Sequence, residues 1–192
     1  MCGIVGYIGK SEALPVLLDG LGRLEYRGYD SAGLAVLNGG GIEVRKSLGR
    51  IENLAREVCS NPVHGGLGIS HTRWATHGGV TLENAHPHTD RTGQLSLVHN
   101  GVIENFRVLR DELIADGHVF VSETDTEVLA HLIGREFESA ASTDEAGLVE
   151  AVRHALSRIR GTYGIAVIHA QVPHFLVGAR RGSPLVLSLI HI

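Results

Sequence analysis

Cys2 is the residue of this chain that is best placed for covalent chemistry, because it is a thiol that directly follows the initiator Met1. If Met1 is removed, Cys2 holds a thiol and a free α-amino group on the same carbon. An α-amino group has an ordinary pKa of about 7.7–8.0, so part of it can accept a proton at neutral pH. A nucleophile activated by its own N-terminal amine is an established form of covalent catalyst. The alternative is a small residue buried at the start of a strand, as free cysteine often is.

Four further clusters could bind a substrate or stabilise charge, and they lie at residues 25–31, 71–79, 99–101 and 122–125. The second and third are expected at the ends of strands. Each also has an ordinary explanation. Arg27 could form a surface ion pair, Arg73 could be a solvated loop charge, and Asp125 could face a helix dipole. Asn100 and Gly101 could form a simple turn. No cluster decides the question alone.

The histidines raise the separate possibility of a zinc site, formed by His71, His77, His86, His88 and His99. Zinc sites are usually recognised by close ligand spacing, such as His-Glu-x-x-His on a helix or Cys-x-x-Cys. The chain has neither pattern. We therefore expect no bound metal and no cofactor.

Composition limits the class of protein. The chain has 192 residues, of which 43% are hydrophobic and 20% charged, and this is typical of a globular domain. A net charge of −4 without a long basic run argues against nucleic-acid binding. Two cysteines make no disulfide framework, so a reducing cytoplasm is the expected location. No apolar run is long enough for a signal peptide or a membrane span.

Hydrophobic periodicity predicts the elements of the first half. Strands are expected at 3–8, 31–37, 42–47, 66–72 and 95–99. Helices are expected from Leu14 to Leu24 and from Ile51 to Val58. The run 38–41, Asn-Gly-Gly-Gly, predicts a hairpin. Residues 73–94 form a long polar loop, and such loops inside compact domains are usually functional or disordered.

The second half predicts three helices and four strands. One helix contains Phe106, Leu109 and Leu113, and capping boxes at 124–127 and 142–145 predict the starts of two more. Short strands are expected at 119–121, 164–169, 175–179 and 185–187. Hairpin-like strands with helices in consecutive pairs favour an α+β fold with antiparallel sheets over a regular βαβ arrangement.

Taken together, the clusters resemble the glutaminase domain of class II, or N-terminal-nucleophile, glutamine amidotransferases. The matching segments cover nearly the whole chain and comprise 2–6, 24–33, 71–78, 84–88, 99–105 and 122–128. The pieces Cys-Gly-Ile and His-Asn-Gly are shared by the class. The forms Tyr-Arg-Gly-Tyr-Asp at 26–30 and Arg-Trp-Ala-Thr-His at 73–77 are similar to the branch that transfers ammonia to fructose 6-phosphate. The resemblance implies a four-layer αββα sandwich of two antiparallel sheets.

The resemblance also implies a catalytic group. Cys2 would attack the side-chain amide of L-glutamine, and its own amine would move the protons. Asn100 and the backbone N–H of Gly101 would form the oxyanion hole. Arg27 would support the site near Cys2.

A second group of residues would bind glutamine. Arg73 would hold the α-carboxylate, for which a planar guanidinium suits a bidentate contact. Asp125 would hold the α-ammonium group. Trp74, Thr76 and His77 would belong to a loop that closes over the substrate.

The resemblance further implies a larger enzyme. Residues 1–187 would form the glutaminase domain, and 188–192 are expected to be a truncation or an appended tail. The sugar isomerase domains that follow in the family would be its partners, in a homo-oligomer that makes glucosamine 6-phosphate. This chain alone is expected to hydrolyse glutamine only.

Two alternatives stay open. A chain that keeps Met1 would be a non-catalytic glutamine-binding module, because the amine of Cys2 would be blocked. The chain could also be the glutaminase domain of another class II amidotransferase with a different acceptor.

Overall fold

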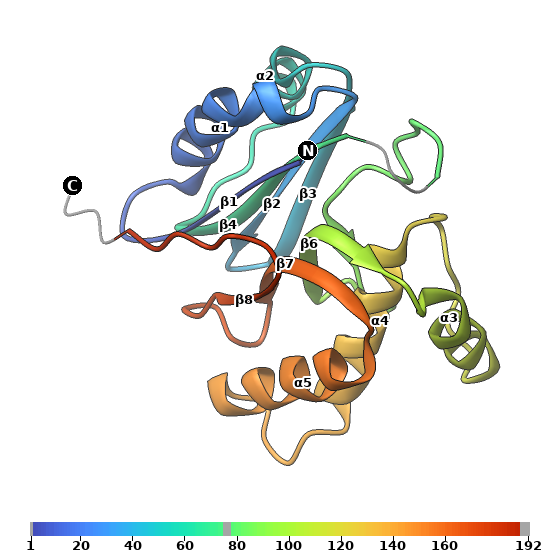
Figure 1. Cartoon of the computed structure of the whole chain (residues 1–192). Coiled ribbons are helices and arrows are strands. Elements are labelled where there is room, and N and C mark those ends of the chain that lie inside the picture. Colours follow the sequence, from blue (N-terminus) through green and yellow to red (C-terminus); the bar gives the residue numbers. More distant parts are fainter. Residues whose placement is uncertain (1, 75–77, 189–192) are drawn as a thin grey trace.

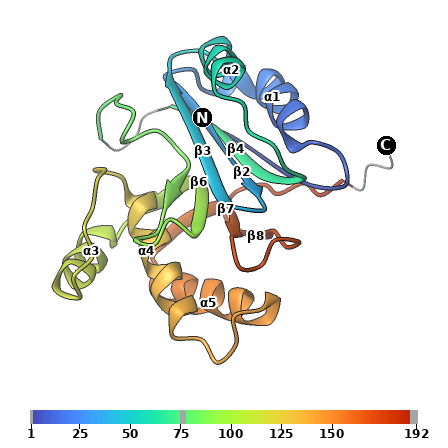
Figure 2. The same cartoon turned by 180° about the vertical axis from the view of Figure 1, so that it is seen from behind.

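Two four-stranded antiparallel sheets form the centre of the described chain, residues 2–74 and 78–188, in this computed structural model (Figures 1 and 2). The first sheet has the order β1-β4-β2-β3, with bounds Gly3–Ile8, Leu67–Arg73, Ser31–Asn38 and Gly41–Leu48. The second has the order β5-β6-β7-β8, with bounds His88–Thr89, Leu95–Ile103, Gly161–His169 and Val177–Arg181. All pairings within the sheets are antiparallel, so the expected α+β class is confirmed.

Helices α1 (Ala13–Leu24) and α2 (Ile51–Ser60) cover the outer face of the first sheet (Figure 1). Leu17 and Leu21 of α1 and Leu54 of α2 are fully buried against β2. The hairpin between β2 and β3 turns at Gly39 and Gly40, as the glycine run predicts.

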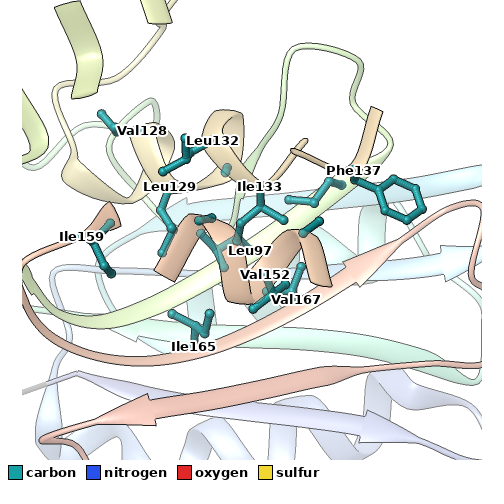
Figure 3. Close-up of a cluster of buried hydrophobic side chains, with 14 of the residues drawn as sticks. Leu97, Val128, Leu129, Leu132, Ile133, Phe137, Val152, Ile159, Ile165 and Val167 are labelled. Carbon is teal, nitrogen blue, oxygen red and sulfur yellow. The ribbon is translucent and has the colours of Figure 1, made fainter. Parts of the chain in front are cut away.

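The face of the second sheet that points away from the first sheet shares a hydrophobic core with three helices, α3 (Phe106–Ala115), α4 (Asp125–Glu138) and α5 (Glu145–Arg158). Figure 3 shows Leu129 and Ile133 of α4 and Val152 of α5 packed near Leu97 and Val167 of the sheet. Together with the first sheet and its helices, this gives the four-layer αββα arrangement. No helix in the described chain is both long enough and apolar enough to cross a membrane.

A third apolar layer lies between the two sheets. Ile69 of β4, Ala35 of β2, Val98 of β6 and Ala166 of β7 pack together there. Successive side chains of a strand point to opposite faces, so residues two apart share a face. By this rule His71 and Arg73 of β4 lie on the same inner face as Ile69. Asn100 of β6 likewise lies on the same inner face as Val98.

Several local predictions differ from the structure, among them the strands expected at 164–169 and 175–179, which are Gly161–His169 and Val177–Arg181. Residues 119–121 form no strand, and Val119 and Val121 are 78% and 73% exposed, because the segment follows the surface between α3 and α4. Residues 185–187 also form no strand in the described chain. Strand β6 does not end at His99 but continues to Ile103, since its pairing with β7 continues past Gly101. Helix α5 is capped by Asp144, not by Ser142.

The N-terminus of α4 is fixed by a buried carboxylate. Thr124 is the N-cap and accepts a hydrogen bond from the Glu127 N–H at 3.3 Å. The Glu127 side chain reaches back and accepts from the N–H groups of Val121 (2.8 Å) and Ser122 (2.7 Å). Burial by itself raises the pKa of Glu127, but His131, Ser122 and the backbone N–H groups outweigh it and hold the pKa at about 2.

Glu127→Gln is expected to lower the free energy of unfolding by roughly 2–3 kcal/mol at pH 7. A lowered folded-state pKa contributes stability that is complete above the ordinary carboxyl pKa of 4.5 and is lost as the pH falls toward 2. The difference between wild type and variant, measured by urea denaturation, should therefore shrink between pH 5 and pH 2. Glu145→Gln, in the exposed first turn of α5, is the control and should change stability by less than about 0.5 kcal/mol. A pH-independent difference would contradict the assignment.

Candidate active site

A cavity of about 860 Å³ opens beside the inner faces of the two sheets. Seven of the nine residues to which the resemblance gives a catalytic or binding role line it, namely Cys2, Arg27, Arg73, Trp74, Asn100, Gly101 and Asp125. The other two, Thr76 and His77, lie outside the described residues. The structure thus brings together segments that are about a hundred residues apart in the sequence.

The Cys2 thiol contacts the backbone at the end of β4. The Trp74 N–H donates to Cys2 Sγ at 3.2 Å, and the thiol donates to the Trp74 carbonyl oxygen at 3.6 Å. Burial raises the pKa of Cys2, Asp30 raises it further, and the Trp74 N–H and Arg73 oppose the rise. The thiol is therefore protonated at neutral pH, and a nucleophilic role requires a base.

Asn100 and Gly101 lie side by side in β6, next to Cys2. The Asn100 side-chain N–H donates to the Cys2 carbonyl oxygen at 3.2 Å, and the Asn100 Oδ1 lies 2.8 Å from His71 Nε2. Gly101 has a φ of +145°, and an added Cβ would lie 2.1 Å from the Thr162 oxygen. Only glycine fits this position, so its backbone approaches the cavity without a side chain.

One cation and one anion line the same cavity. Arg73 is 4% exposed and donates to the Gly79 carbonyl oxygen at 3.2 Å. Asp125 is 5% exposed, and its Oδ2 accepts from the Ile103 N–H at 2.8 Å. Asp125 is also the first residue of α4, where the helix dipole favours a negative charge. A zwitterionic amino acid needs such a pair of opposite charges.

The cluster at 25–31 supports the end of β4. Gly28 packs against the Arg73 backbone so closely that an added Cβ would lie 2.8 Å from the carbonyl carbon and oxygen of Arg73. The Asp30 N–H donates to the same Arg73 oxygen at 3.2 Å. The Trp74 ring is 47% exposed and meets the Tyr29 ring edge-to-face at 5.4 Å. Arg27 reaches the cavity from the short 3₁₀ turn Glu25–Arg27.

A polar link joins two loops of the site, and no pattern in the sequence predicts it. The Asn84 amide donates to the Gly79 oxygen at 3.1 Å and to Glu123 Oε2 at 3.2 Å. The Glu123 N–H donates back to Asn84 Oδ1 at 2.9 Å. Because Gly79 also accepts from Arg73, this link connects the cation to the loop that leads into Asp125. Asn84 is the first residue of the segment 84–88, which matches the family. Its place in that segment is the sequence signal that could have marked it as a site residue.

The histidines pack as rings. His71 stacks on His86 at 4.1 Å, and His86 meets His88 edge-to-face at 4.9 Å. Burial lowers the pKa of His71 to about 3 and lowers the pKa values of His86 and His88 well below the ordinary value. These rings are neutral at working pH. Among the described residues, no group of three or more His, Cys, Asp or Glu is placed to hold a metal ion.

Comparison with protein families gives one match for this chain. A family model described as a glutamine amidotransferase domain matches residues 71–185. This range includes Arg73, Asn100, Gly101 and Asp125, and begins after Cys2.

Curated relatives are similar over the whole chain. The isomerizing glutamine–fructose-6-phosphate aminotransferase of Streptomyces coelicolor is 52% identical over 190 residues, which are 98% of this chain and 30% of the relative. The enzyme of the same name from Symbiobacterium thermophilum is 55% identical over 189 residues, again 98% of this chain and 30% of the relative. The chain thus spans about 30% of the length of these relatives.

Solved structures show the same fold. Glutamine phosphoribosylpyrophosphate amidotransferase from B. subtilis, complexed with ADP and GMP, superposes with a TM-score of 0.74 and 29% identity, covering 88% of this chain and 35% of that one. A structure described as the allosteric regulatory enzyme of purine biosynthesis has a TM-score of 0.75 and 30% identity, covering 88% and 36%.

Proposed function

This chain belongs to the glutamine amidotransferase domain family, and from that membership we propose that it hydrolyses L-glutamine to glutamate and ammonia with Cys2 as the nucleophile. The observation that supports this most is the shared cavity of Cys2, Asn100, Arg73 and Asp125. It combines a thiol, an amide donor and a pair of opposite charges in one space.

The reaction proceeds in two steps. The free amine of Cys2 takes the thiol proton as Sγ attacks the side-chain amide carbon of glutamine. The negative oxygen of the tetrahedral adduct accepts hydrogen bonds from the Asn100 side chain and the Gly101 N–H. The carbon–nitrogen bond then breaks, the amine returns its proton to the leaving ammonia, and a thioester remains. Water, deprotonated by the same amine, attacks the thioester and releases glutamate and the thiol.

Binding of the amino acid head requires the two buried charges. Arg73 pairs with the α-carboxylate and Asp125 with the α-ammonium group. Arg27 supports the wall near Cys2, and Trp74 covers the substrate. Thr76 and His77, which lie outside the described residues, are proposed to bind glutamine as well. A pocket that is built to bind an amide rejects glutamate, because polar groups of the pocket would be left without hydrogen-bond partners.

The names of the relatives support a proposal for the acceptor of the ammonia. Their names specify fructose 6-phosphate as a substrate. This chain corresponds to about 30% of the length of these enzymes, so the rest of each relative has no counterpart in it. We therefore propose that this domain supplies ammonia to sugar isomerase domains, in a cytoplasmic homo-oligomer that makes glucosamine 6-phosphate. Residues 1–187 would be the domain, and 188–192 its tail.

The test uses the state of the N-terminus as its variable. Intact mass identifies chain that has lost Met1, and this chain should release glutamate and ammonia in equal amounts from L-glutamine. The matched control carries an uncleaved Gly-Ser extension ahead of Cys2, which converts the amine into an amide that cannot act as a base. We expect it to be slower by roughly 10²-fold or more. Equal rates in both would contradict the mechanism, and glutamine binding without turnover by the processed chain would favour the binding-module alternative.

A further inference from the structure

We propose that His71 is a positioning residue, whose ring N–H holds the Asn100 side-chain amide in the orientation that turns its NH₂ group toward Cys2. This inference rests on the proposed function, since it concerns the oxyanion hole of that reaction. In the sequence, His71 opens the cluster 71–79 and belongs to the possible zinc ligands, but the resemblance gives it no role of its own.

The contact crosses from one sheet to the other. His71 belongs to β4 of the first sheet and Asn100 to β6 of the second, and both point into the space between the sheets. His71 Nε2 lies 2.8 Å from Asn100 Oδ1, and His71 is 1% exposed. Water therefore cannot easily replace this partner. The apolar layer between the sheets ends in this polar pair, next to the cavity.

The hydrogen-bond pattern assigns the proton of the ring. Asn100 donates from Nδ2 to the Cys2 carbonyl oxygen, so its Oδ1 faces His71 and must accept. His71 then carries its hydrogen on Nε2, and Nδ1 is a lone pair with no hydrogen-bond partner among the described residues. In the other tautomer the Nε2 lone pair would face the Asn100 Oδ1 lone pairs at 2.8 Å, and two acceptors at that distance repel each other.

The His71 ring also packs against a second ring, that of His86. It stacks on His86 at 4.1 Å with 27° between the planes, and His86 Nδ1 accepts from the His99 N–H at 3.4 Å. Burial lowers the pKa of His71 to about 3, so the ring stays neutral across the pH range of an assay. A neutral ring with its hydrogen on Nε2 is a fixed donor. It does not bring a second positive charge beside the oxyanion hole.

The consequence concerns which end of the amide faces the substrate. The two ends of an asparagine amide have similar shapes, so packing alone does not select between them. A flipped Asn100 would present Oδ1 to the oxyanion and would repel it. His71 opposes that orientation, because Nε2–H cannot donate to an NH₂ group, and the Cys2 carbonyl oxygen that accepts from Nδ2 acts in the same direction. The role affects the transition state and leaves the contacts of the glutamine head unchanged.

His71→Gln and His71→Asn make a matched pair for the test. Both are polar amides, but only glutamine is long enough to place an N–H where the histidine Nε2–H lies. We expect His71→Asn to lower kcat for glutamine hydrolysis by roughly 10- to 100-fold, below the 10²–10³ for losing the whole donor. KM should change by less than about twofold. His71→Gln should recover most of the lost rate.

A double-mutant cycle separates positioning from general stability. In an Asn100→Ala background, His71→Asn should cause no further loss of kcat, because no amide remains to be positioned. The inference is overturned if His71→Asn has the wild-type rate, if Gln and Asn are equally impaired, or if the loss persists in the Asn100→Ala background. Failure of the proposed function is a different result, in which the processed wild-type chain hydrolyses no glutamine.

Discussion

Cys2→Ala will lower kcat for glutamine hydrolysis by roughly 10⁴- to 10⁶-fold, the range seen when a covalent nucleophile is removed. No other thiol can replace it, because Cys59 lies exposed in α2 and does not line the cavity. The variant should still bind L-glutamine in calorimetry, since Arg73 and Asp125 remain in place. Loss of turnover with binding retained is the signature of a missing nucleophile rather than of a damaged site.

Cys59→Ser is the matched control for this experiment. It removes the second thiol of the chain and should have a kcat within about twofold of wild type. If Cys2→Ala retained a rate close to that of the control, the thioester mechanism would have to be abandoned. Loss of glutamine binding in Cys2→Ala would indicate instead that the thiol contributes mainly to the structure of the site.

Asn100→Ala is expected to lower kcat by roughly 10²- to 10³-fold, because one oxyanion donor is lost. The Asn100 side chain makes hydrogen bonds with the Cys2 carbonyl oxygen and with His71, and the proposed contacts of the glutamine head are made by Arg73 and Asp125 instead. KM for glutamine should therefore change by less than about threefold. Steady-state kinetics that resolve kcat from KM give the measurement.

Ser96→Ala provides the control, because Ser96 lies four residues earlier on the same face of β6 and is fully buried, whereas Asn100 is half-buried beside the cavity. Its hydroxyl has no hydrogen-bond partner among the described residues, so its removal should leave the rate unchanged. A KM effect as large as the kcat effect in Asn100→Ala would show that the amide acts in ground-state binding and not on the oxyanion.

Local patterns in the sequence predicted most of the elements. The strand 3–8 and the hairpin around Gly39 and Gly40 follow from alternation and from glycine, and both are confirmed. The apolar run 119–121 misled the prediction, because burial depends on what packs above a segment and no helix or sheet covers Val119 or Val121. The end of β6 was placed too early for a related reason: glycine at 101 predicts a turn, whereas pairing with β7 extends the strand.

The candidate site was predictable in its parts but not in its connections. Family resemblance identified Cys2, Arg73, Asn100 and Asp125, and the structure places all four around one cavity. The link between His71 and Asn100 joins two different sheets, and no local spacing encodes such a contact. The alternation that places His71 on the same face as Arg73 was visible in the sequence. Its partner became identifiable only once the sheets were stacked.

The position of β1 in the first sheet has a consequence for how the chain matures. Within that sheet β1 lies at an edge and pairs with β4 alone, and β4 is synthesised about 60 residues later. At the usual rate of about 5–20 residues per second, the ribosome needs roughly 3–12 seconds to reach β4. Throughout that interval the nascent N-terminus has no strand to pair with. If Cys2 acts as the proposed N-terminal nucleophile, an aminopeptidase has several seconds to remove Met1 before β1 pairs with β4.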